Sequence, residues 1–247
     1  MKKIWMAVLL STVLLSCKKE AITPILVNNN TTTVTLAIHQ TLRSFKISPT
    51  FEGLSFETGV LSRNPEFLNI NNSVFIQLLK NLGPGLFRIG GDTSDEIDWT
   101  GKPRNSKTSS DSLTTTDIDR LSAFSKVTGW PVLFGLNLGS NNIKAASDEA
   151  LYVNNSLGSN LYALQAGNEP DIYHMYGLRQ PLYGVYEYLD EWDTYISAVK
   201  AAVPQAYFSG PDVANHIDWI SPFAKNKNKR VRMINAHYYL TGPASNL

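Results

Sequence analysis

Short apolar runs alternate with amphipathic segments along most of this chain, from residue 51 onward. Each run is rich in aromatic, leucine or β-branched residues and leads into glycine, proline or polar residues, which is typical of buried strands. We therefore predict a β-strand at each run. The predicted strands are Phe51–Phe56, Gly85–Ile89, Val132–Leu136, Leu161–Gln165, Ala206–Ser209 and Arg232–Ala236.

Three of the intervening segments carry apolar residues at the spacing of an α-helix. They are Ser73–Asn81, Thr116–Thr128 and Asp190–Val203. The first is followed by Gly83 and Pro84, and the last by Pro204, which are common signals for the end of a helix. Strand, helix and strand in this order predict parallel βα units.

The series predicts an α/β fold of the (β/α)8 TIM-barrel type. A complete barrel has eight strands, whereas six are predicted within the 247 residues of the chain. We therefore expect residues 51–247 to form a partial barrel, truncated after about the sixth βα unit. Residues 34–50 include two alternating runs around a polar turn, which predicts a β-hairpin or leading strands. A segment that covers the bottom of the barrel is the alternative.

The N-terminus has the pattern of a targeting segment. Lys2 and Lys3 precede the apolar stretch Ile4–Leu15, which is too short to span a bilayer comfortably. The following Leu14–Cys17, LLSC, resembles a bacterial lipobox. We expect residues 1–16 to be a lipoprotein signal peptide and Cys17 to be acylated. A plain signal peptide with an incidental cysteine is the alternative.

Residues 17–33 lack periodicity and include the run NNNTTT, so we expect a flexible tether. Cys17 is the only cysteine of the chain, which excludes an intrachain disulfide. Two or three acyl chains on Cys17 would hold the protein stably at a membrane. The predicted location is therefore the bacterial cell envelope, with the protein anchored by lipid.

Composition narrows the function classes. The chain has 22 basic and 21 acidic residues, a formal net charge of +1, so charge gives no reason to expect a nucleic-acid partner. The glycine-rich RIGGDTSD segment matches neither the dinucleotide nor the phosphate-loop pattern. We expect no cofactor and no metal ion.

Polar residues follow several of the predicted strands. The carboxyl ends of parallel strands share one edge of a barrel, where ligands bind, so we expect these side chains to lie on one face. They are Glu57, Asp92, Asn137, Asn168, Glu169, Asp212, His237 and Tyr238. Trp99, just past the second strand, lines the same cleft or belongs to the core.

Glu169 has the most informative surroundings. Pro170 disfavours the right-handed helical conformation for Glu169, so the carboxylate is expected where the backbone leaves the fourth strand. Glycoside hydrolysis uses an acid that protonates the leaving oxygen and a second carboxylate across the bond. Asn168 suits a hydrogen bond to a sugar hydroxyl. A simple turn with a capping role is the alternative for this Asn-Glu-Pro sequence.

Six motifs occur in an order that resembles glycoside hydrolase family 79, the heparanase-like and β-glucuronidase family of clan A. The motifs are FEGLSFE, LFRIGGDTSD, LFGLN, QAGNEPDIY, SGPDV and AHYYLTG, between Phe51 and Gly242. The resemblance implies retaining hydrolysis of β-linked uronic-acid glycosides, an oligo- or polysaccharide substrate, and a (β/α)8 barrel joined to a β-sandwich domain.

The resemblance also implies individual roles. Glu169 matches the acid/base and Asn168 its hydroxyl-binding partner. The positions that match substrate contacts are Glu57, Asp92, Asn137 and Tyr238. His237 is either a ligand contact or a satisfied core histidine.

Two departures from the family pattern limit the expectation. Ala214, Asn215 and His216 follow the GPDV motif, without the basic side chain that heparan-cleaving relatives carry there. The family nucleophile is a glutamate at the end of a seventh strand, and no seventh strand is predicted here.

Three further glutamates, Glu149, Glu187 and Glu191, fall in helical segments and are interpreted as lying on solvated helix faces.

The sequence leaves two hypotheses for the function. One is the N-terminal portion of a lipid-anchored glycosidase, without its nucleophile strand and inactive by itself. The other is a glycan-binding lipoprotein that does not hydrolyse its ligand.

Overall fold

The computed structural model describes residues 46–227 and 229–239. The predicted signal peptide, Cys17, the tether and most of the predicted hairpin lie outside these residues. Residues 46–50 form no strand. In the part of the chain that the structure describes, no helix has the length and apolar character needed to cross a membrane.

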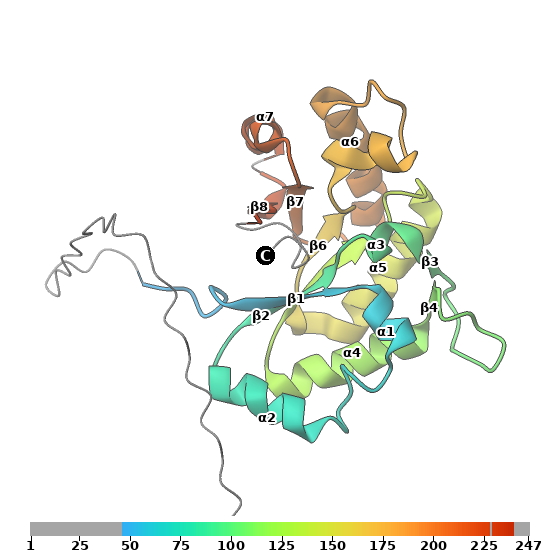
Figure 1. Cartoon of the computed structure of the whole chain (residues 1–247), viewed down its shortest axis with the longest axis vertical. Coiled ribbons are helices and arrows are strands. Elements are labelled where there is room, and N and C mark those ends of the chain that lie inside the picture. The colour runs from blue at the N-terminus through green and yellow to red at the C-terminus, as the bar shows by residue number, and fades with distance from the viewer. Residues whose placement is uncertain (1–45, 228, 240–247) are drawn as a thin grey trace, which may run out of the picture. The chain divides into compact units, whose positions relative to one another are not determined.

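Six strands form one parallel sheet, as Figure 1 shows. They are β1 (Gly53–Glu57), β2 (Leu86–Gly90), β5 (Val132–Leu136), β6 (Leu161–Ala166), β7 (Phe208–Val213) and β8 (Val231–Ala236). Their order in the sheet is their order in the chain, and each neighbouring pair is parallel. The sheet curls into an open half-barrel, which confirms the predicted barrel-type α/β fold.

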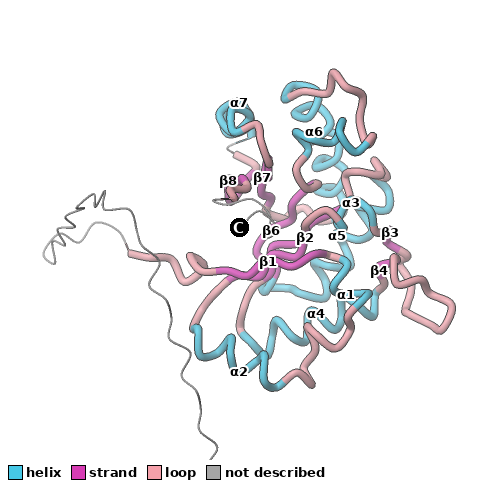
Figure 2. Tube along the Cα trace, viewed as in Figure 1, coloured by secondary structure: helices cyan, strands magenta, loops and turns pink. Residues whose placement is uncertain are grey.

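Helices connect consecutive strands, as Figure 2 shows by colour. The α-helices are α1 (Gly59–Arg63), α2 (Ser73–Leu82), α3 (Thr93–Glu96), α4 (Thr115–Thr128), α5 (Ile143–Leu157), α6 (Val185–Ala202) and α7 (Ile220–Lys227). Short 3-10 helices are η1 (Gly158–Asn160), η2 (Pro170–Tyr176) and η3 (Ile217–Trp219). A two-stranded ribbon pairs β3 (Asp98–Trp99) with β4 (Ser112–Leu113).

The three predicted helices are confirmed within a few residues at their ends. The largest difference is at α6, which begins at Val185 rather than at Asp190. Glu187 accepts a hydrogen bond from the Gly184 backbone N–H, so the helix gains an N-terminal cap there. At α4 the capping is reciprocal, because Asp117 accepts from the Thr114 N–H and Thr114 Oγ1 accepts from the Asp117 N–H.

The end of β7 differs from the prediction. The predicted strand stopped at Ser209, whereas β7 continues through Gly210 and Pro211 to Val213. Pro211 aligns with Asn235 of β8, and the register shifts between Pro211 and Val213. Asp212 therefore lies inside an irregular strand, with a backbone φ of 61°, rather than after the strand.

The core lies between the sheet and the helices that cover its outer face. Phe87, Phe134 and Phe208 from the strands pack with Trp192 of α6 in one continuous apolar cluster. Every residue of β5 and β7 is buried, as expected for strands covered on both faces. On the inner face, Leu86, Leu133 and Ala163 form a second, smaller cluster.

Candidate active site

The parallel register brings the predicted strand-end residues to one edge of the sheet. Glu57 at the end of β1 aligns with Gly90 of β2, and Leu136 of β5 aligns with Ala166 of β6. Asp92 and Glu169 follow two of these ends within three residues. His237 follows β8, and its backbone N–H donates to the Val213 carbonyl of β7 at 2.8 Å.

Glu169 occupies a backbone conformation that few side chains adopt. Its φ and ψ are both 51°, in the left-handed region. Pro170 opens η2 and excludes the right-handed helical conformation from Glu169, as predicted. The Glu169 N–H donates to the Asp212 carbonyl at 3.0 Å, which ties the turn to β7. A non-glycine residue held in this region is a common feature of functional sites.

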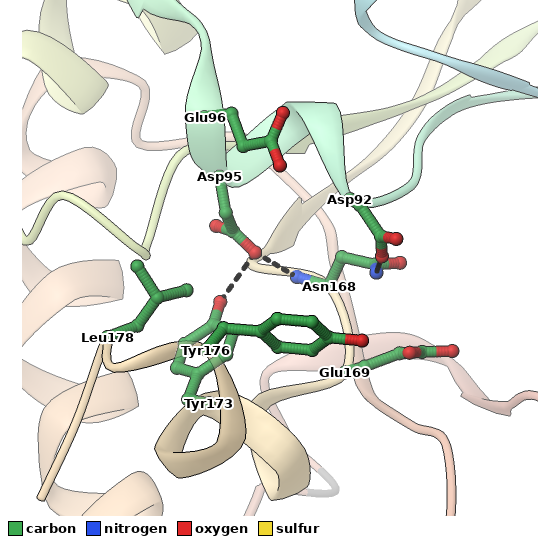
Figure 3. A pocket seen from close by; sticks show the side chains of 8 residues that line it. All are labelled: Asp92, Asp95, Glu96, Asn168, Glu169, Tyr173, Tyr176 and Leu178. Carbon is green, nitrogen blue, oxygen red and sulfur yellow. Dashed lines mark hydrogen bonds between the residues drawn. The ribbon is translucent and has the colours of Figure 1, made fainter.

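A cavity of about 310 Å³ opens beside Glu169. Its lining residues are Asp92, Asp95, Glu96, Asn168, Glu169, Tyr173, Tyr176 and Leu178. Figure 3 shows Asp92 and Glu169 on one side of the cavity and Asp95 between Tyr173 and the backbone of Asn168. Four of the eight lining side chains are acidic and none is basic.

Asp95 holds together the loops that form this cavity. Its Oδ1 accepts from the N–H groups of Leu138 and Gly139 at 2.9 and 2.8 Å. Its Oδ2 accepts from the Asn168 N–H at 2.8 Å and from the Tyr173 hydroxyl at 2.7 Å. Burial raises the pKa of Asp95 to about 6, although these four hydrogen bonds oppose the rise. Because all four bonds serve to join loops, Asp95 is a positioning residue.

Gly167 allows the tight passage from β6 into the Asn168–Glu169 turn. Its φ is +76°, and a Cβ at this position would overlap the Tyr173 hydroxyl that bonds Asp95. A glycine is therefore required on both conformational and steric grounds.

Asn168 has both ends of its amide engaged. Its Nδ2 donates to Asp92 Oδ1 at 2.8 Å, and its Oδ1 accepts from Arg88 Nη2 at 2.7 Å. The same Arg88 nitrogen forms an ion pair with Asp212 Oδ2 at 2.6 Å. These contacts fix the Asn168 side chain beside the cavity.

Asp212, His237 and Glu169 form a connected chain of side chains. His237 Nδ1 contacts Glu169 Oε1, and His237 Nε2 lies 3.2 Å from Asp212 Oδ1. Burial opposes a charge on His237, but the interactions with the Asp212 and Glu169 carboxylates outweigh burial and raise the pKa of His237 to about 9. The imidazole is therefore cationic at neutral pH and orients the Glu169 carboxylate. His237 thus has carboxylate partners, and it lines the cavity on the inner side of the sheet.

The remaining carboxylates at this edge raise the local negative charge. Partial burial, followed by the charges of Glu169 and Glu57, raises the pKa of Asp92. Glu57 Oε2 accepts from the Thr93 N–H and hydroxyl at 2.9 and 2.7 Å. Asp92 is thus close enough to both Glu57 and Glu169 for their charges to act on it.

Of the predicted residues, Asp92, Asn168 and Glu169 line this cavity, and the others lie outside its lining. Asn137 is buried, donates to the Ile97 carbonyl at 3.1 Å, and lines a different cavity together with Trp99. Tyr238 is 85% exposed and borders a third cavity on the inner side of the sheet. Asn137 is turned away because its amide satisfies the Ile97 carbonyl and the Ser140 N–H.

Two of the three helical glutamates are not solvated, which corrects the sequence interpretation. Glu149 is 4% exposed because it lies on the buried stripe of α5 with Ala146, Ala150 and Val153. Glu191 is largely buried in an ion pair with Arg179 at 2.6 Å. Glu187 is exposed, as predicted.

The sequence reasoning missed the roles of Arg88, Asp95 and Asp212. Arg88 interrupts an otherwise apolar strand, a position that signals an inward-facing charge with partners. Asp212 follows a glycine and a proline, which indicates an irregular backbone rather than a strand end. Asp95 carries no comparable signal, because its four donors are distant in sequence or belong to the backbone.

In residues 46–227 and 229–239, no three or more His, Cys, Asp or Glu side chains are grouped so as to hold a metal ion.

No protein-family model matches the chain, and no curated protein sequence matches it. Solved structures do match its fold. A 4-O-α-L-rhamnosyl-β-D-glucuronidase from Fusarium oxysporum is 21% identical, with a TM-score of 0.60 over 78% of this chain and 45% of that one. A family 51 α-L-arabinofuranosidase from Bifidobacterium longum is 18% identical, with a TM-score of 0.58 over 80% and 46%.

A family 39 glycoside hydrolase from Xanthomonas axonopodis is 15% identical, with a TM-score of 0.50 over 77% of this chain and 41% of that one. These neighbours are clan A glycoside hydrolases. At these identities the likeness establishes the shared barrel fold. The chain spans about half the length of the solved structures that it matches.

Proposed function

We propose that this chain carries the acid/base half of the active site of a retaining glycosidase that acts on β-linked uronic-acid glycosides. The observation that carries the proposal is the position of Glu169. It lies at the rim of a barrel-type sheet and lines a cavity together with Asn168 and Asp92, and its carboxylate contacts His237. The uronic-acid preference rests on the resemblance to family 79.

In this proposal Glu169 acts in its protonated, carboxylic-acid form and donates that proton to the glycosidic oxygen while the bond from that oxygen to the anomeric carbon breaks. The cationic His237 contacts one carboxylate oxygen, Oε1. The other, Oε2, has no hydrogen-bond partner among the described side chains and backbone groups, so it is available to the leaving group. In the second step Glu169 accepts a proton from the water that releases the sugar.

The covalent step needs a second carboxylate, which forms a bond to the anomeric carbon. Asp95 does not suit this role, because its two oxygens already accept four hydrogen bonds. Following the family resemblance, we assign the nucleophile to a glutamate on a further strand, beyond the described residues.

A substrate panel tests the proposed class. The protein in its full natural length is assayed on the 4-nitrophenyl β-glucuronide, β-xyloside and α-arabinofuranoside. We expect the β-glucuronide to be hydrolysed with the highest kcat/KM. Faster hydrolysis of either neutral glycoside would contradict the uronic-acid preference. If the protein bound a glycan but hydrolysed none of the three glycosides, the result would support the alternative function, a glycan-binding lipoprotein that does not hydrolyse its ligand.

We further propose that Cys17 is acylated after cleavage behind Ser16 and anchors the protein at the cell envelope. The support is the LLSC sequence that follows a short apolar stretch. Cells that express the protein are labelled with a fatty-acid analogue, and the parent is expected to incorporate it. Equal incorporation by Cys17→Ala would contradict the anchor.

A further inference from the structure

A buried carboxyl group that the proposed mechanism does not use lies in α5. Glu149 is 4% exposed, and no described side chain or backbone group hydrogen-bonds to it. Buried carboxyl groups are normally partnered, because an unpaired polar group in the interior is costly. Glu149 lines a cavity of about 290 Å³, so the cavity is the place where its partner would lie.

The other polar groups of this cavity are suited to hydrogen bonds with hydroxyl groups. The lining residues are Asp98, Trp99, Asn137, Ser140, Asn142, Ala145, Ala146 and Glu149. The Asn137 side-chain amide donates to the Ile97 carbonyl and accepts from the Ser140 N–H, and the Asn142 side-chain oxygen Oδ1 accepts from the Ala145 N–H. The polar wall is therefore largely preformed.

Trp99 provides a flat apolar wall. Its indole Nε1 donates to Asp148 Oδ2 at 2.7 Å, and its ring packs against Tyr152 at 5.6 Å between centroids. These two contacts fix the plane of the ring. A rigid aromatic face beside hydrogen-bonding side chains matches a sugar ring, which has apolar C–H faces and a hydroxyl-bearing edge.

The protonation state of the Glu149 carboxyl group favours a sugar over a cation as the ligand of this cavity. Burial, followed by the charge of Asp148, raises the pKa of Glu149 to about 8. A neutral carboxyl group both donates and accepts hydrogen bonds, as a sugar hydroxyl does. A metal ion would instead require Glu149 to ionise, and the cavity offers only Asp98 as a second carboxylate.

The cavity lies next to the candidate active site along the chain. Asp95 and Glu96 line the cavity beside Glu169, and Asp98 and Trp99 line this one. The two cavities are thus lined by neighbouring residues of the segment 95–99. We propose that the Glu149–Trp99 cavity is a subsite for an uncharged sugar unit of the substrate, distant from the bond that is cleaved. This inference rests on the proposed glycosidase function.

The test compares Glu149→Leu with Glu149→Gln in the full-length protein. The readout is the ratio of kcat/KM on an unsulfated tetrasaccharide with a terminal β-linked glucuronic acid to kcat/KM on 4-nitrophenyl β-glucuronide. Leucine removes the hydrogen bonds, and we expect the ratio to fall about tenfold. Glutamine keeps a donor and an acceptor, and we expect it to retain the ratio within about threefold.

Thermal unfolding separates binding from a structural role. Leucine replaces an unpartnered polar group in an apolar stripe, so we expect the midpoint of Glu149→Leu to equal or exceed that of the parent. An unchanged ratio in Glu149→Leu would overturn the subsite. A rise of the parent midpoint on addition of Ca²⁺, absent in Glu149→Gln, would show a cation site and overturn it as well.

Fluorescence keeps the subsite test independent of catalysis. We expect the tetrasaccharide to change the tryptophan emission of the parent, and Trp99→Phe to abolish the change. If the parent binds in this way but hydrolyses neither substrate, the proposed function fails and the subsite stands. If the parent hydrolyses both but shows no such change, the subsite fails alone.

Discussion

At the scale of single residues, the site depends on side chains whose charges are coupled. Arg88 neutralises Asp212, which lies beside His237, which in turn contacts Glu169. Asp212 is 1% exposed, so its charge requires the partners that Arg88 and His237 provide. The chain of contacts explains how a carboxylate in a strained turn keeps one orientation.

The protonation of His237 should be visible in stability. Its pKa is raised from 6.5 to about 9, so it stabilises the folded state fully below pH 6.5 and loses this contribution as pH rises through 9. We expect the free energy of unfolding to fall by up to about 3 kcal/mol over this range. Denaturant unfolding at pH 6, 7, 8 and 9 measures it.

The matched variants are His237→Gln and His216→Gln. His216 is a half-exposed histidine on the loop after β7. The fall between pH 6.5 and 9 should disappear in His237→Gln and persist in His216→Gln. If His237→Gln retained the full pH dependence, the assignment of the proton to His237 would be wrong.

Residue-scale prediction from sequence succeeded where a local pattern restricts the chemistry. The Asn168-Glu169-Pro170 sequence predicts a carboxylate where the backbone leaves the fourth strand, and the structure has Glu169 beside a cavity. The prediction that Glu149 is solvated is wrong, because Glu149 lies three residues after Ala146 and four before Val153 on the buried stripe of α5. The helical spacing by itself predicts that Glu149 is buried, whereas its charge favours a position in water.

At the scale of elements, buried aspartates join loops that have no regular pairing. Asp171 in η2 is 2% exposed and accepts from the N–H groups of Ala214, Asn215 and His216, each within 2.9 Å. It thus fixes the loop after β7 to the turn that carries Glu169. Asp95 joins α3, the loop after β5 and η2 in the same manner.

Loss of the Asp171 charge should destabilise this connection. We expect Asp171→Asn to lower the free energy of unfolding by about 2 kcal/mol, because one carboxylate oxygen that accepts backbone N–H groups becomes an amide donor. Urea unfolding at pH 7 provides the measurement. Asp218→Asn is the control, since the Asp218 side chain is 77% exposed, and it should change stability by less than about 0.5 kcal/mol. Equal effects of the two substitutions would contradict the role of Asp171.

The elements themselves were largely predictable from sequence. Val132–Leu136 is apolar throughout and forms β5 with the predicted bounds, because a central parallel strand is buried on both faces. The end of β7 was not predictable in this way. Gly210 and Pro211 are ordinary strand-ending residues, and only the pairing of β7 with β8 carries the strand past them.

At the scale of the whole described structure, the half-barrel is buried throughout at the central strand β5 and more exposed at the edge strands β1 and β8. Arg88 and Asn235 lie on the inner face with Leu133 and Met233, around a cavity of about 350 Å³. β1 and β8 each pair with one strand among the described residues, and both alternate between more and less exposed positions. The order of the strands in the sheet could be predicted, because consecutive βα units lie side by side. The contacts of Arg88 with Asn168 and Asp212 could not be predicted, because they join strands that are distant in the sequence.

The most direct test of the central claim is the leaving-group dependence of Glu169→Gln in the full-length protein. Protonation by an acid matters most for a poor leaving group, so kcat/KM on an alkyl β-glucuronide should fall by at least about 10³-fold. On 2,4-dinitrophenyl β-glucuronide, whose leaving group needs no proton, the first step should be nearly unaffected, and added azide should speed release of the sugar as a β-glucuronosyl azide. Equal losses on both substrates, with no azide effect, would contradict an acid/base role for Glu169.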